Sequence, residues 1–290
     1  MAPAARLNKR IAGALGFPRN FRSAGSLCRT LAVFSVSVVA FAEPHPAGSF
    51  SAYCVAASTP LDAQLRKVVD GDTLLLADGR RVRLIGVNTP ELDHRGAADE
   101  PGAQEAARFA AAFLVKKQIG LVFGVGARDR YGRVLAHVYS ASGASLEEAL
   151  LDAGFARHIV VPPNTVQADC LAGAEQRART AHRGLWGSGT FLPRDTALLR
   201  PGENGFRLLQ GRVSAVEKSK SSWWIELDDR VSLRIDRSDQ KYFRWEDVAR
   251  LDRQVVEVRG WLAWRGTSSP EHPPWLMRLR HPLSLHANRD

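Results

Sequence analysis

The chain has few thiols, and its histidines are scattered. Three cysteines occur among 290 residues, and the eight histidines do not cluster. Neither Cys54 nor Cys170 has a histidine at the spacing expected for a zinc site or for a thiol nucleophile. The sequence therefore argues against zinc chemistry and cysteine catalysis, and oxygen and guanidinium groups are the candidates for any reaction.

Acidic residues are absent from positions 1–42, which carry six basic residues. The apolar run from Leu31 to Ala42 is shorter than the about 20 residues that span a bilayer. With the small residues Ala40 and Ala42 it has the pattern of a signal peptide cleaved after Ala42. We therefore expect a secreted or periplasmic protein, with an uncleaved membrane anchor as the alternative.

The formal net charge of +10 falls to +4 when those six basic residues are removed. Charge alone is then weak support for nucleic-acid binding. Cys54 and Cys170 would be the two cysteines of the mature chain. In an oxidising compartment an even pair favours one disulfide, and two unrelated thiols are the alternative.

Residues 64–186 follow a segment at 43–63 and have a mixed pattern typical of a compact domain. Asp78 and Gly79 favour a hairpin turn, and glutamate at the third position of the second helix predicts a capping box. Five short strands with interspersed helices predict an α+β, mainly β fold built on a small closed barrel. Strands are expected at 65–69, 73–76, 81–87, 120–123 and 133–139, and helices at 103–115, 145–151 and 167–182.

Glycine and proline mark a linker at 187–205, and a second β domain is expected at 206–287. Its pattern predicts five strands and one helix, at 238–251, and therefore a second small OB-like barrel. Tryptophan and arginine could stack the bases of a single strand there, but a structural or protein-binding role is the alternative. Six of the seven tryptophans lie in this domain: Trp223, Trp224, Trp245, Trp261, Trp264 and Trp275.

Three short segments together suggest phosphodiester hydrolysis. Residues 69–73 read VDGDT, residues 83–91 read RLIGVNTPE, and residues 129–133 read DRYGR. Each is weak alone, since aspartate and glycine are common in turns. In combination they supply oxygen ligands for a hard cation, two guanidinium groups for a phosphate and a carboxylate that could activate water.

These segments, with AEQRAR at 174–179 and GLW at 184–186, resemble the staphylococcal nuclease family across residues 64–186. The resemblance implies an OB-type five-stranded barrel with three helices. It also implies a calcium-dependent phosphodiesterase that acts on DNA or RNA and leaves 3′-phosphate ends.

The resemblance assigns a metal site to the first two segments. Asp72 matches a calcium-binding aspartate, and Thr89 matches a threonine that offers its backbone carbonyl to Ca²⁺. Asn88 stands where well-known members have a second aspartate, which predicts weaker calcium binding. Asp70 is expected to lie beside the metal ligands rather than among them.

The resemblance also assigns the reacting groups. Arg83 and Arg133 match two arginines that hold the phosphate, and Glu91 matches the general base. Tyr131 matches a tyrosine near the substrate, and with Arg130 it forms the predicted substrate contact. For catalysis these groups must surround one phosphate, and burial of either arginine in an internal ion pair would end the case for catalysis.

A further departure lies at 158–164, where founding members have base-stacking tyrosines and this chain has none. The family also contains domains that bind nucleic acid or peptides without cleaving them, so a non-catalytic binding module is the alternative function. A cell-envelope protein that uses both barrels as interaction surfaces is a third possibility.

Overall fold

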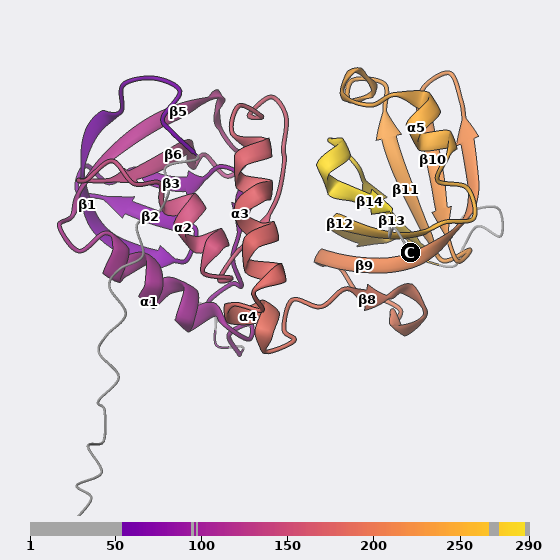
Figure 1. Cartoon of the computed structure of the whole chain (residues 1–290), viewed down its shortest axis with the longest axis horizontal. Coiled ribbons are helices and arrows are strands. Elements are labelled where there is room, and N and C mark those ends of the chain that lie inside the picture. Colours follow the sequence, from indigo (N-terminus) through magenta and orange to yellow (C-terminus); the bar gives the residue numbers. More distant parts are fainter. Residues whose placement is uncertain (1–53, 94–95, 97, 267–272, 288–290) are drawn as a thin grey trace, which may run out of the picture. The chain divides into compact units, whose positions relative to one another are not determined.

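A computed structural model describes residues 54–93, 96, 98–266 and 273–287. Its first part is a closed five-stranded barrel in the order β1-β2-β3-β6-β5, which confirms the predicted barrel (Figure 1). Side chains such as Leu74, Val82 and Val138 fill its core. The strands are β1 (Leu61–Asp70), β2 (Thr73–Leu76), β3 (Arg81–Leu84), β5 (Gln118–Arg128) and β6 (Val134–Ser140).

The chain leaves the barrel at the end of β3. The single strand expected at 81–87 is wrong, because Gly86 has φ +84° and interrupts it. Beyond this break, β4 (Val87–Asn88) pairs antiparallel with β7 (Arg157–His158) instead of with a barrel strand. The break therefore turns Asn88 away from the barrel sheet.

Helices lie beside the first barrel and contribute to its core. Half of the predicted capping box of α2 is present: the Ser145 side chain accepts a hydrogen bond from the Glu148 amide at 3.2 Å, whereas the Glu148 carboxylate accepts from the Cys54 amide and from Arg177. Ala110 of α1 and Leu171 of α3 belong to the barrel core. The helices are α1 (Ala103–Phe113), α2 (Leu146–Asp152), α3 (Ala168–Thr180) and the short α4 (Gly184–Gly187).

The expected disulfide is formed. Cys54 is bonded to Cys170 on α3, with their Cα atoms 5.6 Å apart. The predicted signal peptide lies outside the described residues. Within the ranges that the structure describes, no helix combines the length and apolar character needed to cross a bilayer.

The second part is also a barrel, and its ring closes where β12 pairs with β9. Outside the ring, the short strand β8 (Arg194–Asp195) pairs parallel with β9, and β14 (Leu285–Ala287) pairs antiparallel with β12. Apolar residues including Leu209, Ile225 and Met277 fill the core. The five ring strands are β9 (Gly205–Lys218), β10 (Ser222–Leu227), β11 (Val231–Asp236), β12 (Val255–Trp264) and β13 (Trp275–Arg278).

The helix expected at 238–251 is divided in two. Phe243 and Arg244 have extended backbones, and the Phe243 side chain packs against the second core. The 3₁₀ turn η2 (Gln240–Tyr242) precedes this point and α5 (Trp245–Ala249) follows it. Two further 3₁₀ turns are η1 (Thr196–Leu198) and η3 (Pro282–Ser284).

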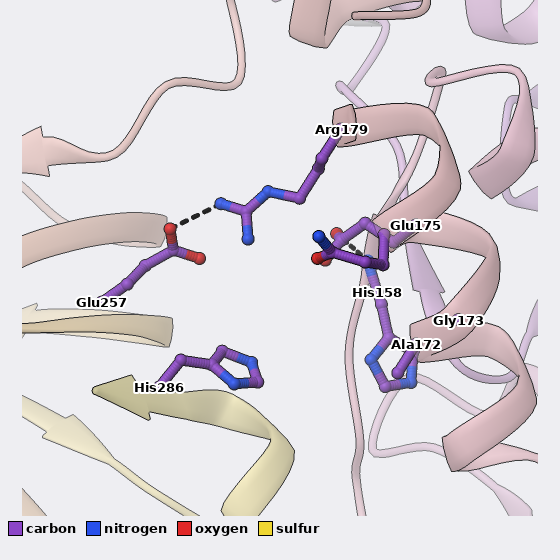
Figure 2. Close-up of a pocket in the computed structure, with 8 residues that line it drawn as sticks. His158, Ala172, Gly173, Glu175, Arg179, Glu257 and His286 are labelled. Atoms are coloured by element: carbon purple, nitrogen blue, oxygen red, sulfur yellow. Dashed lines mark hydrogen bonds and ion pairs between the residues drawn. The ribbon is translucent and has the colours of Figure 1, made fainter. Parts of the chain in front are cut away.

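Arg259 of β12 joins the two barrels, which belong to one compact unit. Its Nη1 lies 2.6 Å from the Glu175 carboxylate of α3 and 3.1 Å from the His158 carbonyl oxygen. Its Nη2 donates to Glu257 at 3.0 Å. Arg179 donates to the same Glu257, and Figure 2 shows this pair together with the hydrogen bond between His158 and Glu175.

Replacing Arg259 with alanine should lower the free energy of unfolding by about 3–5 kcal/mol, because Glu175 would stay buried without its cation and Glu257 would keep only Arg179. Chemical denaturation measures this loss. The matched control is Arg250→Ala, whose side chain is 74% exposed beside Asp247 and whose removal should change stability by less than about 0.5 kcal/mol. Equal effects of both substitutions would contradict the assigned role of the buried cluster.

Gly71 lets the turn between β1 and β2 lie against a neighbouring loop and α1. A Cβ atom added there would come within 2.7 Å of Thr89 Cγ2 and 2.8 Å of Ala106 Cβ. Gly71→Ala should therefore lower the free energy of unfolding by about 1–3 kcal/mol, since two packed neighbours would have to move. Thermal or chemical denaturation measures the change.

Gly173→Ala provides the control for that substitution. Gly173 lies within α3, and a Cβ atom added there would meet no neighbouring atom within 4 Å. Alanine at this position should therefore raise stability by up to about 1 kcal/mol through helix propensity. If the Gly71→Ala protein were as stable as the unsubstituted protein, the turn would have space for the added methyl group, and the prediction would be wrong.

Candidate active site

The turn at 70–73 binds the loop that follows β4. Asp72 is 1% exposed, and its Oδ2 accepts a hydrogen bond from the Thr89 amide at 2.9 Å. The Thr73 hydroxyl donates to Asp72 Oδ1 at 3.2 Å, and the Asp72 amide donates to Asp70 Oδ1 at 3.1 Å. These bonds bring Asp70, Asp72 and Thr89 together, although Thr89 is 17 residues from Asp72 in the sequence.

Arg83 extends from β3 into this group, and its terminal nitrogens are engaged by the protein. Nη2 lies 2.9 Å from Asp72 Oδ2 and 3.1 Å from Asn88 Oδ1. Nη1 donates to the carbonyls of Leu84 and Val87, both at 2.9 Å. The side chain is 8% exposed, so Arg83 is buried in an internal ion pair, the condition expected above to end the case for catalysis.

Arg133 approaches the same turn from the start of β6. Asp129 holds it, accepting from the Arg133 amide at 3.0 Å and from Nε at 2.7 Å. Nη1 donates to the Thr73 hydroxyl at 3.3 Å. Its side chain is 26% exposed, so this guanidinium is more open to solvent than that of Arg83.

Glu91 lies within electrostatic range of both arginines. Partial enclosure of its carboxyl, and then the charge of Asp72, raise the pKa of Glu91. Arg83 and Arg133 act in the opposite direction. Its backbone is fixed by Glu100, whose carboxylate accepts from the Glu91 amide at 3.1 Å. The candidate base therefore shares one electrostatic environment with Asp72 and both guanidinium groups.

Negative charge is crowded at the turn. Burial, followed by the charges of Asp72 and Glu91, raises the pKa of Asp70 to about 7. A cation placed among these carboxylates would relieve their mutual repulsion. The position that Asp70 occupies, beside Asp72 rather than facing Asn88, agrees with a supporting role.

The oxygen atoms at this place suit a hard cation. In the described ranges no group of three or more histidine, cysteine, aspartate or glutamate side chains has the arrangement of a metal site. The predicted donors are the Asp72 carboxylate, the Asn88 amide oxygen and the Thr89 backbone carbonyl, which accepts from Asn88 Nδ2 at 3.4 Å. The cationic Nη2 of Arg83 already bridges the first two oxygens. Such oxygen donors fit calcium or magnesium better than zinc.

Tyr131 and Arg130 form an exposed aromatic and basic pair beside Arg133. Tyr131 is 68% exposed, and its hydroxyl accepts from Arg130 Nη2 at 2.7 Å. The Arg130 and Arg133 guanidinium carbons lie 4.8 Å and 5.6 Å from its ring centroid. An unpaired base could reach this ring from solvent.

Residues 158–164 serve packing. His158 is 2% exposed, and burial, followed by the charge of Arg259, lowers its pKa to about 3. Asn164 accepts from the Gly126 amide of β5 at 2.9 Å, and Arg280 of the second barrel donates to the Pro162 carbonyl at 3.1 Å. The segment is thus occupied by contacts within the protein.

Sequence reasoning did not single out Glu100 or Arg157 as neighbours of the site. Arg157 pairs with Asn88 in the β4–β7 ladder, and its guanidinium lies between the rings of Phe191 and Phe206, at 4.8 Å and 4.7 Å. Burial, the main cause, lowers the Arg157 pKa to about 10. Only the long-range pairing reveals this residue, because no local motif surrounds it.

Comparisons with known proteins agree with this geometry. The family described as "Staphylococcal nuclease homologue" matches residues 81–188. A thermonuclease of Staphylococcus intermedius is 31% identical over 42% of this chain and 74% of its own length. The prophage-derived endonuclease YokF of Bacillus subtilis is 29% identical over 56% of this chain, and the match spans about half of its length, 53%.

One relative carries a different kind of name. The succinoglycan biosynthesis protein ExoI of Rhizobium meliloti is 30% identical over 60% of this chain and 84% of its own length. The family match at 81–188 covers the segments that carry Arg83, Asn88, Glu91 and Arg133. The chain therefore belongs to the staphylococcal nuclease family.

Proposed function

We propose that this protein is an exported calcium-dependent nuclease that hydrolyses phosphodiester bonds of DNA, RNA or both and leaves 3′-phosphate ends. One observation carries the proposal: Arg83 contacts Asp72 and Asn88, Asp72 accepts from the Thr89 amide, and Arg133 reaches the adjoining Thr73. Catalytic acids and guanidinium groups from three separate segments thus converge on one turn.

Each side chain has a role that its position supports. Glu91 takes the proton of the attacking water, since it lies within range of both arginines. Arg133 holds a phosphate oxygen and stabilises the charge that accumulates during in-line attack. Asp129 keeps the guanidinium of Arg133 in place. Tyr131 and Arg130 contact the adjoining nucleotide.

The residues that would hold calcium are Asp72, Asn88 and Thr89. When bound, the ion would polarise the phosphodiester and offset its negative charge. Asp70 and Glu91 add negative charge nearby, which favours a divalent cation over a monovalent one.

The buried ion pair of Arg83 is the observation that most opposes catalysis. Arg83 shares Asp72 Oδ2 with the proposed metal site. A calcium ion held by Asp72 would compete with Arg83 for this carboxylate, and Nη2 of Arg83 would then be available to a phosphate, while Nη1 would keep its bonds to Leu84 and Val87. Without a metal ion, the ion pair with Asp72 would keep Arg83 next to the position where it would contact the phosphate.

Export is supported by the basic and apolar pattern of residues 1–42 and by the Cys54–Cys170 disulfide, which persists in oxidising compartments. The second candidate function is a non-catalytic nucleic-acid- or protein-binding module. The internal pairing of Arg83 favours it. Binding of single strands without cleavage in added calcium would decide for that module.

Glu91→Gln and Arg133→Ala should each lower the rate of DNA or RNA cleavage by about 10²–10⁴-fold, because one removes the base and the other a stabilising charge. Digestion of single- and double-stranded DNA and RNA with calcium or a chelator, with end groups identified, provides the measurement. The matched controls are Glu105→Gln and Arg108→Ala, an exposed pair on α1. Near-normal cleavage by either site variant would remove this mechanism.

Asn88→Asp should tighten calcium binding by about tenfold or more, since it adds a negative charge next to Asp72. Titration calorimetry of the purified protein measures the change. Gln176→Glu, at an exposed position of α3, adds the same charge elsewhere and should leave calcium affinity unchanged. Unchanged or weaker binding by Asn88→Asp would refute the assignment of residue 88 as a metal ligand.

A further inference from the structure

Trp261 is an exposed aromatic residue on the face of β12 that also carries the buried Glu257 and Arg259. Side chains at 257, 259 and 261 of β12 point to the same side of the strand. Glu257 and Arg259 are buried in the ion pairs with α3, whereas Trp261 is 49% exposed. The tryptophan therefore lies at the solvent edge of the contact between the barrels.

A continuous series of contacts joins Trp261 to the candidate active site. Its ring meets that of Phe206 edge to face, with centroids 5.3 Å apart, and Phe206 lies 4.7 Å from the Arg157 guanidinium carbon. Arg157 pairs with Asn88 in the β4–β7 ladder, and Asn88 accepts a hydrogen bond from Arg83. Phe206, Arg157 and the β4–β7 pairing thus connect Trp261 to the predicted metal ligand Asn88.

The surroundings of Trp261 favour nucleic acid over a protein partner. Within the described residues from 206 onward, Trp261 alone is at once large, hydrophobic and exposed, so there is no broad apolar patch for a protein. Positive charge is close, since Arg207 donates from Nη1 to the Phe206 carbonyl at 2.9 Å and Arg157 adjoins the Phe206 ring. An aromatic ring beside guanidinium groups suits an unpaired base and its phosphate.

We propose that Trp261 stacks on a base of a single-stranded substrate whose scissile phosphate lies at the candidate active site, with Arg207 contributing positive charge to the strand. The inference rests on the proposed function for the position of the scissile phosphate. It supplies a stacking surface from the second barrel to a chain whose 158–164 segment offers none. A double strand would bind less well, because its bases are stacked on each other.

Binding is measured first, in chelator, so that cleavage plays no part. Fluorescence anisotropy with a labelled single strand of about 12 nucleotides gives the affinity. Trp261→Ala should weaken binding by about 5- to 100-fold, and Trp261→Phe should restore most of it. Leu198→Ala, which removes a 62% exposed apolar side chain of η1, is the control and should change affinity by less than about twofold.

The stacked base is located with strands that carry one abasic nucleotide at successive positions. At one position the missing base should weaken binding to the unsubstituted protein but not to Trp261→Ala, because both changes remove the same contact. In cleavage assays with calcium, Trp261→Ala should raise KM and leave kcat within about twofold. A merely structural role would not produce dependence on one base.

The outcomes separate this inference from the proposed function. A protein that shows the Trp261 effect on binding but never cleaves would support the stacking site and refute the nuclease. A protein that cleaves normally while Trp261→Ala binds every strand as well as the unsubstituted protein would refute the stacking site alone. Additive losses at all abasic positions, or no single-strand binding in chelator, would likewise overturn it.

Discussion

The buried ion pair between Asp72 and Arg83 is the interaction on which the site depends. Both side chains are withdrawn from water, and a buried pair of this kind contributes little net stability because desolvation offsets attraction. Its contribution is geometric. Arg83 also binds the carbonyls of Leu84 and Val87 and the side chain of Asn88, so one guanidinium fixes the exit of β3, the turn at 70–73 and the start of β4.

Negative charge at this place exceeds what the two guanidinium groups can offset. Arg83 is committed to Asp72, and Arg133 is held by Asp129, so within the described part of the chain Asp70 and Glu91 form no ion pair of their own. The raised pKa values of Asp70 and Glu91 are the result, with burial as the first cause in each. A stable fold does not need such a concentration of carboxylates, whereas a site that binds a divalent cation does.

Local patterns predicted the barrels well, since strand alternation and turn residues determine elements such as β2 and the Asp78–Gly79 turn. Where long-range contacts decide, the sequence was insufficient. Strand 81–87 divides because Gly86 takes positive φ, and helix 238–251 divides because Phe243 packs into the second core. The site residues came from family resemblance, and their roles remain predictions. Arg259 and Glu175 are 84 positions apart, and no local signal indicates that pairing.

The second barrel contacts a strand next to the candidate site, although this barrel lies outside the family match at 81–188. Arg259 binds the carbonyl of His158, and His158 pairs with Val87 across the β4–β7 ladder. That ladder is only two residues long, so its own hydrogen bonds hold Asn88 weakly. The buried Arg259, which binds β7, restricts the position of β7. Through the ladder it also restricts the position of Asn88. This series of contacts explains structurally why the second barrel belongs to the same compact unit. It is also a route by which binding of a nucleic-acid strand to the second barrel could affect residue 88.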